Sequence, residues 1–122
     1  MSTGYLALVL HAHLPYVRHP EHVRPMEERW LFEALAECYL PLLGVFERLS
    51  RDEVPFSLTM SLTPPLAAML KDELLRQRFH DHLARIEELA VREVDRLQGD
   101  PRFLPIAQFY VQHLADVRRR WD

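Results

Sequence analysis

The chain has 122 residues, enough for one globular domain and too few for two. With 48% hydrophobic and 27% charged residues, it has the composition of a folded protein and not of a disordered one. A formal net charge of -3 excludes a general attraction for nucleic acid or for anionic membranes. No apolar run approaches the roughly 18 residues of a membrane span, so we expect neither nucleic acid nor membrane as a partner.

The first predicted element is a strand. Tyr5–Leu10 is a short, nearly continuous apolar run, the pattern of a strand that is covered on both faces in a parallel sheet. Pro15 and Pro20 then predict an irregular loop over residues 11–25.

A helix, a second strand and three further helices follow in the prediction. From Met26, apolar residues recur at steps of three and four, which predicts a helix with a kink or a restart at Pro41. Val54–Met60 is the second predicted strand. The later helices are expected to begin near Pro65, Leu75 and Pro105, and Gly99 and Pro101 are expected to end the second of these three.

The element order β-α-β-α-α-α indicates the α/β class, with two adjacent parallel strands. Two strands cannot form a stable parallel sheet with helices on both faces. We therefore expect residues 1–122 to be the first part of a larger domain, cut within its architecture. The alternative is a small α+β domain that a partner chain completes.

The single cysteine, Cys38, has apolar neighbours at helical spacing in Leu35, Tyr39 and Leu42. This pattern predicts a buried structural thiol and not a nucleophile. One thiol without a disulfide partner fits a reducing compartment, so we expect a cytoplasmic location.

The segment most informative about chemistry follows the first strand. His11 and His13 are two residues apart, so on a strand their side chains point the same way. In parallel α/β folds, the carboxyl end of a strand lies at the active-site face. Arg18, His19 and Glu21 follow in a loop that is able to fold back over such a site.

Two kinds of site are compatible with this histidine pair. The first is the start of a zinc-hydrolase site, which needs further His and Asp ligands. The second is a sugar-binding pair beside catalytic carboxylates. His80 and His82 diverge on a helix and are predicted to lie on the surface, and His113 has no evident ligand neighbour, so the sequence offers no third ligand.

Residues Leu8–Glu21 (LVLHAHLPYVRHPE) closely resemble the N-terminus of glycoside hydrolase family 57, and most of all its branch of 1,4-α-glucan branching enzymes. Trp30–Leu43 is similar to the first helical region of that family, including the internal Pro41. Phe56–Leu66 resembles its second strand and the loop after it.

The resemblance implies a (β/α)7 barrel, of which this chain is the truncated N-terminal portion. It implies an α-glucan as substrate, with retaining cleavage and transfer or hydrolysis by a Glu nucleophile and an Asp acid/base. Both carboxylates lie on later strands of the family, so no catalytic residue is expected in this chain, and the rest of the barrel is an expected partner. His11 and His13 would line the donor sugar subsite, and we expect no metal and no cofactor.

Four further residues are possible contributors to the sugar site: Pro15, Arg18, Glu21 and Trp30. Glu33 and Glu37 are predicted to lie in water on the outer face of a helix. Trp30 is expected to anchor that helix more than to stack on sugar. A fragment of a metal-dependent barrel hydrolase and a non-enzymatic interaction module remain open as alternatives.

Overall fold

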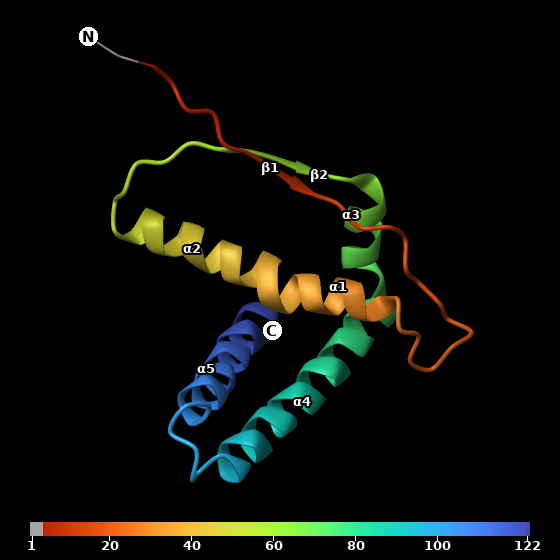
Figure 1. Ribbon diagram of the computed structural model, residues 1–122. Coiled ribbons are helices and arrows are strands. Elements are labelled where there is room, and N and C mark those ends of the chain that lie inside the picture. Colours follow the sequence, from red (N-terminus) through yellow and green to blue (C-terminus); the bar gives the residue numbers. More distant parts are fainter. Residues whose placement is uncertain (1–3) are drawn as a thin grey trace.

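The computed structural model describes residues 4–122, which form a two-stranded sheet, a long interrupted helix and a helical hairpin (Figure 1). In chain order the elements are β1 (Val9–Ala12), α1 (Glu28–Ala34), the π-helical turn η1 (Leu35–Tyr39), α2 (Leu40–Arg51), β2 (Thr59–Leu62), α3 (Pro64–Lys71), α4 (Glu73–Arg96) and α5 (Leu104–Trp121).

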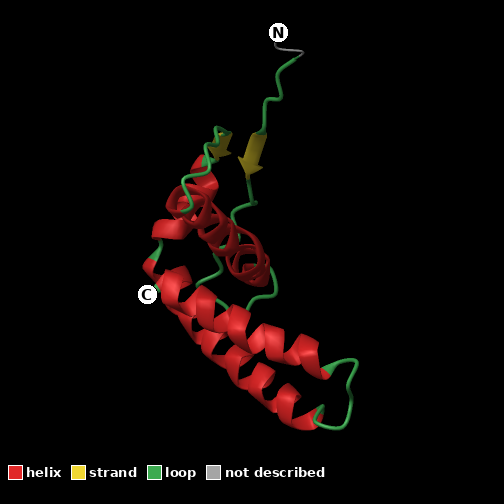
Figure 2. Ribbon diagram, turned by 90° about the vertical axis from the view of Figure 1, so that its left-hand side faces the viewer, coloured by secondary structure: helices red, strands yellow, loops and turns green. Residues whose placement is uncertain are grey.

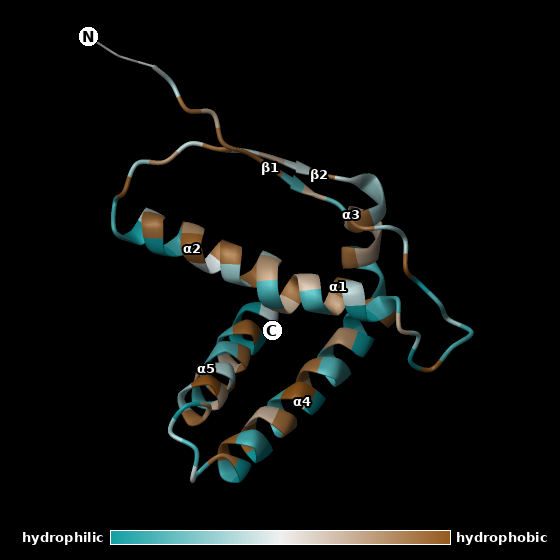
Figure 3. Cartoon of the chain, in the orientation of Figure 1, coloured by the Kyte–Doolittle hydropathy of each residue, from teal (hydrophilic) through white to brown (hydrophobic). Residues whose placement is uncertain are grey.

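The elements are arranged in three levels. Both views place the sheet at one end, the continuous run of α1, η1 and α2 in the middle, and the α4–α5 hairpin at the other end (Figures 1 and 2). Apolar and polar residues alternate along α4 and α5, as the amphipathic pattern of the sequence predicts (Figure 3). Among residues 4–122 no helix combines the length and the apolar character that a membrane crossing requires.

The two strands are parallel neighbours, as predicted, and pair in four rungs from Val9 opposite Thr59 to Ala12 opposite Leu62. The predicted bounds of both strands are wrong by several residues, because pairing occurs only where the two extended segments overlap. Within residues 4–122 the strands are not covered on both faces, as they would be in the complete parallel sheet that the apolar pattern predicts. Val9 and Leu62 leave 64% and 51% of their surface exposed.

The helix boundaries follow local chemistry. Pro41 lies near the start of α2, inside a helical run that continues from α1 without a break, and the π-helical turn directly precedes it. Because proline has no amide proton, it cannot donate a helical hydrogen bond at this position, and the irregular turn lies next to that missing bond. Asp72 caps α4, because its Oδ1 accepts a hydrogen bond from the Leu75 amide at 3.0 Å. The predicted end of that helix before Gly99 and Pro101 is confirmed.

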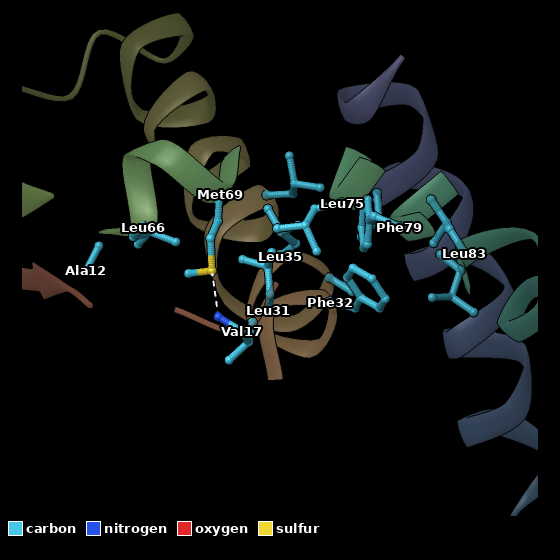
Figure 4. Close-up of a cluster of buried hydrophobic side chains, with 14 of the residues drawn as sticks. Ala12, Val17, Leu31, Phe32, Leu35, Leu66, Met69, Leu75, Phe79 and Leu83 are labelled. Carbon is cyan, nitrogen blue, oxygen red and sulfur yellow. Dashed lines mark hydrogen bonds between the residues drawn. The ribbon is translucent and has the colours of Figure 1, made fainter. Parts of the chain in front are cut away.

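The core is built where α1, α3, α4 and α5 meet (Figure 4). Phe79 of α4 is fully buried, and its ring lies 5.8 Å from that of Phe32 and 4.7 Å from that of Trp121. Ala12 of β1 joins the same cluster beside Leu66, so one face of the sheet is held against the helices (Figure 4).

The prediction that Cys38 is buried is wrong, because the thiol is exposed. The prediction assumed a regular α-helix through this region. A π-helical turn holds more residues per turn than an α-helix, so residues after its start shift around the helix axis. Leu35 and Ala36 stay buried while Cys38 turns toward water. The cysteine therefore carries no argument about cellular compartment.

The prediction that His82 lies on the surface is also wrong, since only 8% of the residue is exposed. Its ring lies 5.2 Å from that of Phe32, between α4 and α1. Because α4 packs against α5 and also against α1, its buried surface is wider than a single apolar stripe. His80, two residues earlier, is exposed as predicted.

Burial of His82, together with the nearby positive charges of Arg85 and Arg29, lowers the pKa of its imidazole below 6.5. The imidazole of His82 is therefore protonated near pH 6.5 in the unfolded chain, whereas in the folded chain it is protonated only at a lower pH. We expect the free energy of unfolding to fall as pH drops through this range, and to fall less in His82→Gln. Chemical denaturation at several pH values measures the difference. The exposed-site control His80→Gln keeps the wild-type pH dependence, and a parallel curve for His82→Gln contradicts the assignment.

Candidate functional site

His11 and His13 lie side by side at the carboxyl end of β1. Their ring centroids are 5.7 Å apart and their planes differ by 8°. Ala12 between them is 4% exposed and points to the helices, whereas both histidines are exposed. Because side chains alternate along a strand, the two imidazoles share the sheet face that the helices of the described chain leave open.

Ser61 of β2 orients the first of these rings. It stands opposite His11 in the parallel register, and its Oγ lies 2.5 Å from His11 Nδ1. An imidazole with one nitrogen engaged by a hydroxyl has a second nitrogen that is able to bond a ligand. No role for Ser61 was predicted from the sequence. Its place at the carboxyl end of the neighbouring strand was the signal available for it.

The loop after His13 does not fold over the two rings. It runs from β1 to the beginning of α1 past the junction of α3 and α4 (Figure 1). In the described chain the loop therefore does not take the course over the site that the sequence had left open. The reason is a set of polar contacts that hold Arg18 and His19 against α4 and its cap.

Arg18 donates from Nε to Asp72 Oδ2 at 2.6 Å. Partial burial alone would raise the pKa of Asp72. Hydrogen bonds from the Leu75 amide and from Arg18 outweigh burial and hold that pKa below its ordinary value. Asp72 therefore remains a carboxylate that serves both as the cap of α4 and as an anchor of the loop.

Glu21 lies exposed in the same loop, where its Oε1 is 3.1 Å from His19 Nδ1. A hydrogen bond from its own backbone amide and a second from His19 lower the pKa of Glu21. A carboxyl group with a lowered pKa is ionised at neutral pH and is poorly suited to act as a general acid. Pro15 is exposed, and Trp30 leaves 49% of its surface open on α1.

The remaining histidines do not join the pair. His113 of α5 lies with Nε2 3.0 Å from the carbonyl oxygen of Ala36 and 3.7 Å from Glu37 Oε2. It thus has an acidic neighbour that the sequence did not indicate. Within residues 4–122 no three His, Cys, Asp or Glu side chains gather as a metal ion would require.

Two open hollows lie along the helices and not beside the histidine pair. One, of about 970 Å³, lies between the loop over residues 20–26 and α4. The other, of about 740 Å³, lies between α1, α4 and α5 and includes Phe103 and Tyr110. Neither is lined by His11 or His13, so the exposed strand face is a separate surface.

The chain is similar to known proteins over almost its whole length. It is 43% identical, over 79% of its residues, to a 1,4-alpha-glucan branching enzyme of Thermococcus kodakarensis, of which it spans 14%. The crystal structure of that enzyme, in complex with glucose and additives, matches 97% of the chain and 21% of its own length with a TM-score of 0.84 and 34% identity.

Two other solved structures have the same fold over this region. A branching enzyme from Pyrococcus horikoshii matches 97% of the chain and 22% of its own length, with a TM-score of 0.87 and 38% identity. An alpha-amylase from Thermotoga maritima matches 91% of the chain and 21% of its own length, with a TM-score of 0.83 and 45% identity. The family model of glycosyl hydrolase family 57 matches residues 7–120. The chain therefore belongs to glycosyl hydrolase family 57.

Proposed function

We propose that residues 1–122 are the N-terminal segment of an α-glucan-acting barrel enzyme, and that β1 and β2 are the first two strands of its (β/α)7 barrel. The observation that carries this proposal is the parallel strand pair with a helix-free face. That face presents two stacked imidazoles and the exposed apolar side chain of Val9. Exposed apolar strand faces are what further strands and their side chains cover in a closed barrel.

The proposed substrate class is an α-1,4-glucan. Relatives and structural neighbours of the chain are named as 1,4-alpha-glucan branching enzymes and as an alpha-amylase, and one neighbour was solved with glucose. These names include enzymes of transfer and of hydrolysis. We therefore propose the substrate class and do not choose between the two reactions.

In the proposed site His11 and His13 bind hydroxyl groups of a sugar ring. A neutral imidazole both donates and accepts a hydrogen bond, which matches the hydroxyls of glucose. Ser61 fixes the first ring through the contact at 2.5 Å. The other predicted contributors lie on the loop after β1 and on α1: Pro15, Arg18, Glu21 and Trp30. They contribute to the proposed sugar site through that loop and that helix and not from the open strand face.

The nucleophile and the acid/base are proposed to come from outside residues 1–122. A retaining pair consists of two carboxyl groups about 5–5.5 Å apart across the scissile bond. Here Glu28, Asp72 and Glu87 are each engaged by an arginine, at 2.5, 2.6 and 2.7 Å respectively. Carboxylates held in this way stabilise the helices and are not available for attack on a sugar.

We therefore expect the 122-residue chain to leave amylose unchanged. After incubation with amylose, neither new reducing ends nor new α-1,6 linkages should accumulate above the level of a buffer control. Reducing-sugar analysis and NMR of the anomeric protons measure the two products. Turnover by this chain alone contradicts the proposed location of the catalytic pair.

Binding is expected even without turnover. Titration of the chain with maltotetraose, followed by NMR, should shift the ring signals of His11 and His13. His11→Ala should weaken binding about tenfold, the usual effect of losing one hydrogen bond to a ligand. The matched control is His80→Ala, which removes an exposed imidazole from α4. Equal binding by both variants contradicts the proposed sugar site.

A further inference from the structure

A buried ion pair lies beneath the loop that follows the candidate site. Glu28, the first residue of α1, leaves 2% of its side chain exposed, and Arg78 of α4 leaves 16%. Arg78 Nη1 donates to Glu28 Oε1 at 2.5 Å. Two charges taken out of water in this way need further hydrogen bonds to compensate for lost hydration.

Those further bonds all go to the loop. Arg78 Nη1 also donates to the carbonyl oxygen of His19 at 3.1 Å, and Nη2 donates to that of His22 at 2.6 Å. The amide of His19 in turn donates to Glu28 Oε1 at 3.2 Å. One guanidinium therefore joins α4, the first turn of α1 and two backbone positions of the loop.

Two separate contacts hold the earlier half of the loop. Arg18 pairs with Asp72 at the beginning of α4, and the Val17 amide lies 3.3 Å from Met69 Sδ. These contacts act next to the point where the chain leaves His13. The Arg78 network holds the later half of the loop, at His19 and His22, before the chain enters α1.

We propose that Arg78 is a positioning residue, which clamps the loop between β1 and α1 onto α4 through three acceptors at once. A guanidinium offers five donors in a planar fork, whereas a lysine ammonium is a point charge on a flexible stem. The clamp needs this fork, because its three acceptors belong to two different segments. The effect of this clamp on sugar binding rests on the proposed role of His11 and His13.

The substitution Arg78→Lys tests the clamp, because it keeps a positive charge beside Glu28 and lets the chain fold. Amide hydrogen exchange measured by NMR reports on each position separately. The reporters are the amides of His19 and His22, which bond to Glu28 Oε1 and to the His19 carbonyl respectively. The matched control is Arg118→Lys, which alters a second partly buried arginine–glutamate pair, with Glu87, far along α4 from the loop.

In Arg78→Lys the two reporter amides should exchange about tenfold faster, while amides in α5 such as that of Leu114 keep their wild-type rates. In Arg118→Lys the reporters should be unchanged. Wild-type rates at the reporters in Arg78→Lys would overturn the proposal. So would an equal acceleration throughout the chain, because that is the result of general destabilisation.

A sugar titration of the same samples tests the link to the site. The dissociation constant for maltotetraose should rise in Arg78→Lys and stay unchanged in Arg118→Lys. An unchanged constant in Arg78→Lys, with faster loop exchange, would overturn the positioning role for sugar binding. Absence of binding by the wild-type chain would instead contradict the proposed function, while the exchange result would still decide whether the clamp exists.

Discussion

Replacing Phe79 with alanine is expected to lower the free energy of unfolding by about 4 kcal/mol, the usual cost of removing a buried aromatic ring. The ring is fully buried and lies against Phe32 and Trp121, so its removal leaves an apolar cavity in the core. Since domains of this size are stable by about 5–15 kcal/mol, the loss is a large fraction of the total. Urea denaturation followed by circular dichroism measures it.

The matched control for this prediction is Phe109→Ala. Phe109 leaves 59% of its surface exposed and packs mainly on Tyr110 and His113. Its loss should cost about 1 kcal/mol or less. Similar costs for the two substitutions would show that α1, α4 and α5 do not share one core at Phe79.

Replacing Arg78 with methionine is expected to destabilise the chain by about 3–5 kcal/mol, because it leaves a buried carboxylate without its counterion. Glu28 is only 1% exposed, so water cannot easily take the place of the guanidinium. The same substitution also removes the guanidinium donor from the carbonyl oxygens of His19 and His22, of which the first keeps the His22 amide as a donor. Denaturant titration again gives the number.

The second half of this prediction is a rescue. Adding Glu28→Gln removes the uncompensated charge while keeping an oxygen that accepts from the His19 amide. The double variant should therefore be more stable than Arg78→Met alone by roughly 1–3 kcal/mol. If the two substitutions destabilise additively, the pair is not coupled and the buried ion pair is not the reason for the loss.

The order of elements and the parallel pairing were predictable, because periodicity and the positions of proline and glycine are local signals. The strand bounds were not. Tyr5 and Leu6 are as apolar as the paired residues, yet they are 99% and 95% exposed. A segment is a strand only where a neighbour offers partners, and the overlap of two segments is a tertiary property.

Side-chain burial was predictable only where a helix is regular and packs on one side. Cys38 was misplaced by a π-helical turn, and His82 by a second helix packed against α4. The link between Glu28 and Arg78 was missed for another reason. Charged residues 50 positions apart on two helices each look solvated, and only the fold brings them to 2.5 Å.

The candidate site followed from the sequence in part. The alternation of side chains on a strand predicted that His11 and His13 share a side, and the stacked rings agree with this. The course of the following loop was not predictable, because it depends on where Arg18 and Arg78 find their acceptors on α4 and α1.

We propose that a sugar binds the chain on the open face of β1 and not along the helices. Intermolecular nuclear Overhauser effects between maltotetraose and the chain test this directly. We expect contacts from sugar protons to the ring protons of His11 and His13. Contacts confined to Phe103 and Tyr110, which lie in the hollow between α1, α4 and α5, would contradict sugar binding on the strand face.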